Sequence, residues 1–152
     1  MTKNNCKNLS RTAEDYLEAI LNVTIEKGYA RTGDVARELH LSPSSVVEVF
    51  KKLDAMGLIE YRKYEGVVFK PKGREMAELI KYRHDTLREF LMMASVPADI
   101  AAVDACYMEH ELHPDTIRCI RSFIEVFEED PTLTTMIQKR INMKRNQVED
   151  TT

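Results

Sequence analysis

The sequence predicts a mainly α-helical protein, in which an N-terminal winged helix-turn-helix is followed by an all-helical domain. Three observations support this prediction. Apolar residues recur at helical spacing along most of the 152 residues. Cap and stop residues divide the first third of the chain into three helices. A pattern typical of two short strands comes directly after the third helix.

The first two helices are marked by a threonine at each expected start. Thr12 opens a sequence typical of a capping box, and the apolar positions that follow it end near Gly28. Thr32 is the expected cap of a short second helix. Both helices have one apolar face, which they would bury in a shared core.

The third helix has the strongest start signal of the chain. Ser42 is a cap residue, and Pro43 suits the first helical position, where no backbone N–H is needed. The helix is expected to end at Gly57. Residues 58–63 and 67–70 then read as two strands joined by a turn, which would form the wing.

The second half of the chain predicts four more helices, over residues 71–95, 98–112, 114–127 and 132–143. The polar tail from Lys144 is expected to be frayed. These elements divide the chain into a winged helix-turn-helix, a helical domain and a polar tail, with expected bounds of 1–71, 72–145 and 146–152. The helix over residues 71–95 would link the two domains.

Composition and charge are those of an ordinary globular protein, with 43% hydrophobic and 31% charged residues. Residues 1–83 carry 15 Lys and Arg against 12 Asp and Glu, a net charge of +3. Residues 84–152 carry 7 against 13, a net charge of −6, so the first part suits an anionic partner better. Three cysteines make no disulfide framework, and no apolar run approaches membrane-spanning length. We therefore expect a cytoplasmic protein with reduced thiols and no membrane partner.

The third helix is the expected recognition helix, because the second helix of a helix-turn-helix contacts DNA bases with its N-terminal residues. Glu48 departs from this expectation, since an acid on this helix repels phosphate unless it accepts a hydrogen bond from the amino group of cytosine. A winged helix used for protein contacts is the alternative. The expected DNA-binding residues, which offer hydroxyl groups or positive charge, are Ser42, Pro43, Ser44, Ser45, Lys51, Lys52, Arg62 and Lys63.

The sequence Cys106-x-x-Glu109-His110 places a thiol, a carboxylate and an imidazole on one face of an expected helix. A soft sulfur beside oxygen and nitrogen suits a divalent transition metal. The alternative is a partly buried cysteine beside an exposed acid and histidine. A hydrolytic metal site with Glu109 as base is disfavoured, because the sequence lacks HExxH, a nucleophile elbow and a phosphate-binding loop. We therefore expect a protein that is not an enzyme.

Segments along nearly the whole chain, from about Arg11 to Pro131, are similar to one known family. The segments are Glu26-Lys-Gly-Tyr-Ala-Arg31, Ser42-Pro-Ser-Ser-Val46, Lys52-Leu-Asp54, Tyr82-Arg-His84, Glu89-Phe-Leu91 and Glu109-His110. They resemble the diphtheria toxin repressor family of metal-dependent transcriptional regulators, in particular its short manganese transport regulator branch. The resemblance implies a homodimer in which the helical domain binds metal and dimerises.

The resemblance also implies a set of metal ligands. The manganese branch has five ligands that match this chain, namely Asp15, Glu18, His84, Glu109 and His110. Its sixth ligand is a glutamate where this chain has Cys106, whereas the iron branch has cysteine there and methionine in place of Asp15. The expected cofactor is therefore Mn(II) or Fe(II), with Co(II) or Zn(II) possible in vitro.

The function implied by the resemblance is repression of metal-uptake genes, with the metal as corepressor. The expected partners are a second copy of the chain and a palindromic operator in double-stranded DNA. The alternative is a winged-helix regulator that senses oxidation through Cys106.

Overall fold

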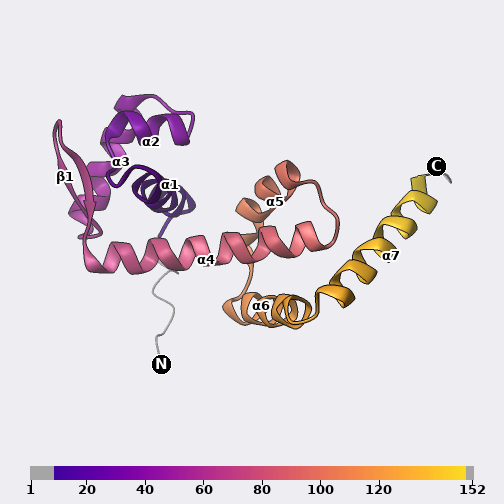
Figure 1. The fold of residues 1–152 in the computed structure, drawn as a ribbon. Helices are drawn as coiled ribbons and strands as arrows, with labels where there is room; N and C mark the ends of the chain where they lie inside the picture. Colours follow the sequence, from indigo (N-terminus) through magenta and orange to yellow (C-terminus); the bar gives the residue numbers. More distant parts are fainter. Residues whose placement is uncertain (1–8, 150–152) are drawn as a thin grey trace. The chain divides into compact units, whose positions relative to one another are not determined.

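A computed structural model of the chain describes residues 9–149, and the ends of the expected first domain and polar tail lie outside this range. The described part is mainly helical and contains one two-stranded sheet. It divides into two compact units, of which unit 1 ends at Lys81 and unit 2 begins at Tyr82. The predicted fold class, an N-terminal winged helix-turn-helix before a helical domain, is confirmed (Figure 1).

Unit 1 is the winged helix-turn-helix. It contains, in order, α1 (Arg11–Lys27), α2 (Thr32–Glu38), α3 (Pro43–Ala55), β1 (Ile59–Arg62), β2 (Gly66–Phe69) and the first half of α4 (Pro71–Met93). Its core is built from the apolar faces of these elements, with Leu17, Phe50 and Ile59 fully buried. Burial of this apolar surface is the main term that holds the three helices together.

The helix starts in unit 1 confirm one expected cap and correct two. Ser42 accepts a hydrogen bond from the backbone N–H of Ser45, and Pro43 is the first residue of α3. The cap of α1 is Ser10, whose hydroxyl accepts from the backbone N–H of Ala13, so the expectation of Thr12 was wrong. The short α2 begins at Thr32 itself and has no side-chain cap.

The wing is an antiparallel hairpin in which Ile59 pairs with Phe69 and Arg62 with Gly66. Gly66 approaches Ala30 so closely that a Cβ atom would lie 2.3 Å from the Ala30 carbonyl oxygen. Only glycine fits there, at a φ of 112°. This contact fixes the wing against the loop before α2.

Unit 2 contains the second half of α4, α5 (Ala98–Glu111), α6 (Pro114–Glu128) and α7 (Pro131–Glu149). Leu87, Ala105 and Ile117 form a small core among the first three of these helices. The expectation of a frayed tail from Lys144 was wrong, since α7 continues to Glu149. Good helix formers fill this segment, and Arg145 donates to the Ser95 carbonyl at 2.9 Å. Within residues 9–149 there is no helix of the length and apolar character needed to cross a membrane.

Candidate metal centre and nucleic-acid interface

Four of the predicted metal ligands come together within unit 2. His84 lies on α4, and Cys106, Glu109 and His110 lie on α5 at the i, i+3 and i+4 positions that share one helix face. Ligand atoms of the three α5 residues all lie within 4.8 Å of one another. The Nδ1 atom of His84 lies 3.0 Å from Glu109 Oε2, which joins α4 to this cluster.

Glu109 is the centre of the cluster. Its side chain is only 1% exposed, although a carboxylate is costly to bury without compensation. The Oε2 atom is satisfied by His84, but the buried Oε1 atom has no hydrogen-bond partner among residues 9–149. His110 Nε2 lies 3.4 Å from Oε1 without hydrogen-bond geometry. The buried carboxylate of Glu109 therefore has the imidazole of His84 beside one oxygen and the imidazole of His110 beside the other.

These residues fit a divalent transition metal. The cluster offers one carboxylate oxygen, one sulfur and two imidazole nitrogens, the donor atoms that such ions bind in proteins. A cation would satisfy Glu109 Oε1 and offset the negative charge that the fold buries. The alternative of a cysteine beside an exposed acid is wrong, because Glu109 is buried.

Asp15 and Glu18 lie in unit 1, one turn apart on α1, and both are half-buried. Their spacing places both carboxylates on the same side of the helix. The spacing of the pair is a weak signal in the sequence, because an acid in a first helical turn is common for other reasons, and the family resemblance implies both residues as ligands.

The predicted recognition helix α3 buries one face and exposes the other. Val46, Phe50 and Leu53 face the core of unit 1. The opposite face exposes the serines at the helix start, whose hydroxyls lie 2.9–3.0 Å apart, together with Lys51, Lys52 and Glu48. The polar face is therefore available to a double helix along its whole length.

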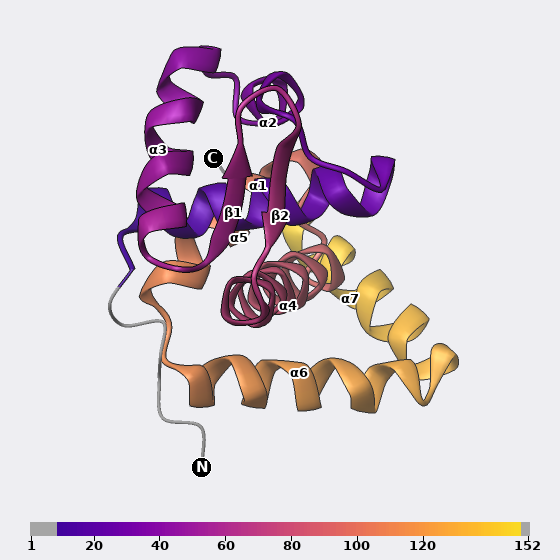
Figure 2. The same cartoon turned by 90° about the vertical axis from the view of Figure 1, so that its left-hand side faces the viewer.

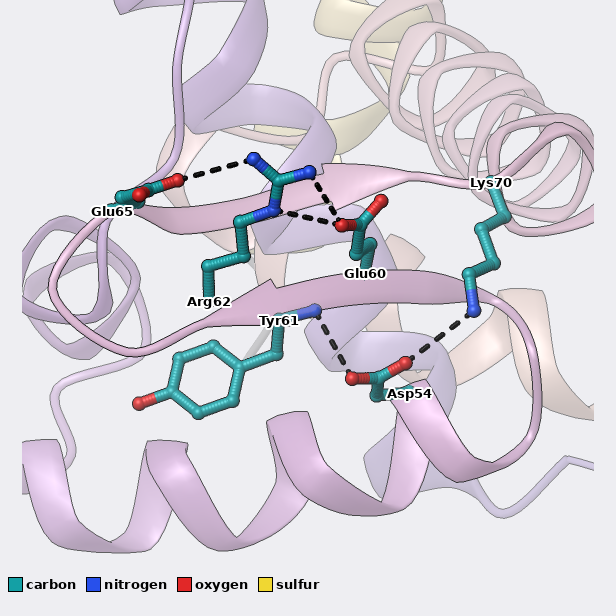
Figure 3. Close-up of polar contacts among 6 residues, drawn as sticks. All are labelled: Asp54, Glu60, Tyr61, Arg62, Glu65 and Lys70. Carbon is teal, nitrogen blue, oxygen red and sulfur yellow. Dashed lines mark hydrogen bonds and ion pairs between the residues drawn. The ribbon is translucent and has the colours of Figure 1, made fainter.

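The two predicted DNA-binding residues of the wing differ in their surroundings. Arg62 forms ion pairs with Glu60 at 2.7 Å and with Glu65 at 3.3 Å, as Figure 3 shows. The hydrogen bond to Glu60 raises the pKa of the Arg62 guanidinium most, and the hydrogen bond to Glu65 raises it further. Lys63 instead has its ammonium 5.0 Å from the centre of the Tyr64 ring. Tyr64 is 87% exposed at the tip of the hairpin.

Two domain families match the chain in the order that the fold suggests. The N-terminal DNA binding domain of iron dependent repressors matches residues 8–67, and their metal binding and dimerisation domain matches residues 70–138. The chain belongs to the iron-dependent repressor family. This membership confirms the resemblance found in the sequence.

Curated relatives of this iron-dependent repressor include two bacterial proteins named HTH-type transcriptional regulator MntR. The one from Geobacillus thermodenitrificans (strain NG80-2) is 37% identical over 133 residues, which cover 88% of the chain and 89% of the relative. The one from Bacillus subtilis (strain 168) is 38% identical over 117 residues, which cover 77% of the chain and 82% of the relative.

Solved structures share the fold of this iron-dependent repressor at lower identity. The manganese regulator SloR matches with a TM-score of 0.65 and 24% identity, covering 74% of this chain and 53% of SloR. The metal-dependent transcriptional regulator MtsR matches with a TM-score of 0.68 and 23% identity, covering 77% of this chain and 55% of MtsR.

Family membership defines the general function. The chain is a metal-dependent DNA-binding transcriptional repressor, and its family is one of regulators rather than enzymes. The matched domains indicate DNA and a second copy of the chain as its partners. A divalent metal is its cofactor.

Proposed function

We propose that this repressor controls metal-uptake genes in the cytoplasm, with Mn(II) or Fe(II) as its corepressor. Its DNA site would be a palindromic operator, because two copies of one recognition helix read two equivalent half-sites. The observation that supports metal binding is the buried Oε1 atom of Glu109, for which the described part of the chain supplies no hydrogen-bond partner. The resemblance of the sequence to the manganese transport regulator branch favours manganese.

The proposed ligands are His84, Cys106, Glu109 and His110 of unit 2, joined by Asp15 and Glu18 of unit 1. The first four have donor atoms close enough together to share one or two ions. The two α1 residues are proposed because the sequence matches the manganese branch at both positions. When bound, the divalent ion would supply the positive charge that these acidic ligands lack.

The proposed regulation follows from ligands drawn from both units. Without compensating charge, the carboxylates of Asp15, Glu18 and Glu109 repel one another and favour arrangements that hold them apart. With all the ligands engaged, the two units would be restricted to fewer relative arrangements. In a dimer, this restriction sets the separation of the two α3 helices, for which neighbouring half-sites require about 34 Å.

Cys106 bears on the choice of metal. A thiolate raises affinity for Fe(II), Co(II) and Zn(II) relative to Mn(II), whereas the carboxylates of Asp15 and Glu18 suit Mn(II). The proposed site is therefore intermediate between the manganese and iron branches of the family.

Replacement of the thiol tests this proposal against oxidation sensing. We expect anaerobically purified Cys106→Glu protein to keep metal-dependent DNA binding, with its preference shifted toward Mn(II) over Fe(II). The measurement is fluorescence anisotropy of a labelled operator duplex, selected from random sequences, during titration with each metal. Cys119→Ser is the matched control, because Cys119 is an exposed thiol on α6. If the Cys106 variant loses all regulation while wild-type protein responds to peroxide, the chain is an oxidation sensor instead.

A further inference from the structure

Glu48 is an acidic residue at the centre of the exposed face of α3. The buried stripe of this helix is formed by Val46, Phe50 and Leu53. At about 100° per residue, Glu48 lies within about 20° of the direction opposite to that stripe. Figure 2 shows α3 at the edge of unit 1, with α2 and the wing both on one side of it. Glu48 is therefore the residue of α3 that points most directly away from the core.

The fold provides no partner for Glu48. Its side chain is exposed and forms no hydrogen bond or ion pair with any of residues 9–149. Lys51 and Lys52 lie three and four residues further along α3, at spacings that often give ion pairs on a helix, but neither pairs with it in this structure. The helix dipole favours acids only in the first turn, and Glu48 is the sixth residue of α3. The described part of the chain therefore offers no intramolecular role for this carboxylate.

The residues around Glu48 suit DNA, whereas its own charge does not. Ser44 and Ser45 lie one turn before it, and Lys51 and Lys52 flank it on either side of the helix. Hydroxyl and ammonium groups bind phosphates, but a carboxylate near phosphates raises the free energy of binding. A hydrogen bond from the edge of a base would offset this cost.

The major groove offers two kinds of donor to a carboxylate, the amino groups of cytosine and of adenine. The adenine amino group lies between two acceptors, its own N7 atom and the O4 atom of the paired thymine. The cytosine amino group has one neighbouring acceptor, the O6 atom of the paired guanine. A carboxylate meets less repulsion beside cytosine, so cytosine is the base that suits Glu48.

We propose that Glu48 determines base specificity by binding a cytosine in the major groove of each operator half-site. One carboxylate oxygen accepts a hydrogen bond from the cytosine amino group. At other base pairs the same carboxylate lies beside acceptors and is repelled, so Glu48 also lowers the affinity for wrong sequences. The proposal rests on DNA binding by the family and is independent of the identity of the metal.

Glu48→Gln tests the contact, because the amide keeps the size of the side chain and removes its charge. Metal-loaded full-length protein is used to select operators from random duplexes, and each base pair of the wild-type operator is then replaced in turn. We expect the wild type to prefer cytosine about tenfold at one position of each half-site. The variant should lose this preference, because an amide also forms hydrogen bonds with adenine. Its affinity for a mixed-sequence duplex should rise about threefold, since a negative charge has been removed from the DNA-binding face.

Glu75→Gln is the matched control, because Glu75 is an exposed acid near the start of α4, which Figure 2 shows at the opposite end of unit 1 from the start of α3. It should keep the base preference and the mixed-sequence affinity of the wild type. The proposal is overturned if Glu48→Gln keeps the wild-type preference at every position, or if Glu75→Gln makes the same change. Wild-type metal-dependent binding is measured in the same series, so failure of this contact is distinguishable from failure of the proposed function.

Discussion

At the scale of single residues, Glu109 lowers the stability of the metal-free fold and also serves as a proposed metal ligand. Its carboxylate is 1% exposed, and the described residues satisfy only one of its two oxygens by hydrogen bonding. Such a group destabilises a fold unless something else binds it. We therefore expect metal-free protein to be destabilised by the same residue that anchors the metal.

Glu109→Gln tests this trade between stability and binding. The neutral amide removes the buried charge, so the metal-free variant should be more stable than the wild type by about 1 kcal/mol. Its affinity for Mn(II), measured by calorimetry, should fall by at least about tenfold. Glu111→Gln on the same helix is the control, because Glu111 is exposed, and it should change neither quantity. A variant that is less stable and yet binds Mn(II) normally would contradict this role for Glu109.

The sequence predicted the α5 part of the metal site because helical periodicity alone brings positions 106, 109 and 110 to one face. It did not reveal that His84, 25 residues earlier, contacts Glu109, since that contact depends on how α4 packs against α5. Only the resemblance to a family pointed to His84.

At the scale of elements, α1 and α2 are joined by a small charge cluster around Asp34. Lys27 of α1 donates to Asp34 Oδ1 at 2.7 Å, and Arg37 of α2 pairs with the same oxygen. The hydrogen bond from Lys27 lowers the pKa of Asp34, to which Arg37 also contributes, although partial burial opposes it. The cluster stabilises the helix-turn-helix only while the carboxyl group is ionised.

Asp34→Asn should therefore lower stability in a pH-dependent way. A lowered folded-state pKa stabilises the protein above the ordinary carboxyl value of 3.8, and this stabilisation is lost as the pH falls through the folded-state pKa. We expect a loss of less than about 1 kcal/mol at pH 7, because the partners are largely exposed. Urea unfolding at pH 7 and pH 3 measures it, with the exposed Glu38→Gln as control. A difference that grows at pH 3 would contradict the assignment.

The starts of α3 and α1 show where local sequence is sufficient to predict the cap of a helix and where it is not. Ser42-Pro43 predicted the start of α3 correctly, because the pair combines a cap with a residue that suits only the first turn. Ser10 and Thr12 are both residue types that cap helices well, and the residue that caps α1 is Ser10. Leu9 packs against the core of unit 1, and this tertiary contact favours the earlier start.

At the scale of the whole molecule, α5 carries an exposed apolar stripe that suits a second copy of the chain. Ile100, Val103 and Tyr107 follow helical spacing and are 48–59% exposed. The stripe lies within the matched metal binding and dimerisation domain. An exposed stripe of this kind in a protein with a dimerisation domain is a candidate interface.

Val103→Glu should weaken the dimer, because it places a charge in the centre of the stripe. Sedimentation at micromolar concentration should show a monomer, whereas the wild type should remain a dimer. Val68→Glu makes the same change at an exposed position of unit 1 and should leave the dimer intact. If both variants stay dimeric, another face of the chain forms the interface.

The central claim is that metal binding controls DNA binding. Its most direct test is the affinity of the full-length protein for one selected operator duplex, measured after chelation, after addition of Mn(II) or Fe(II), and after renewed chelation. Coupling between two sites in one protein typically amounts to a factor of about 5–150, so we expect the loaded protein to bind tighter within that range and chelation to reverse the effect. Equal affinity of the chelated and loaded protein would contradict the account.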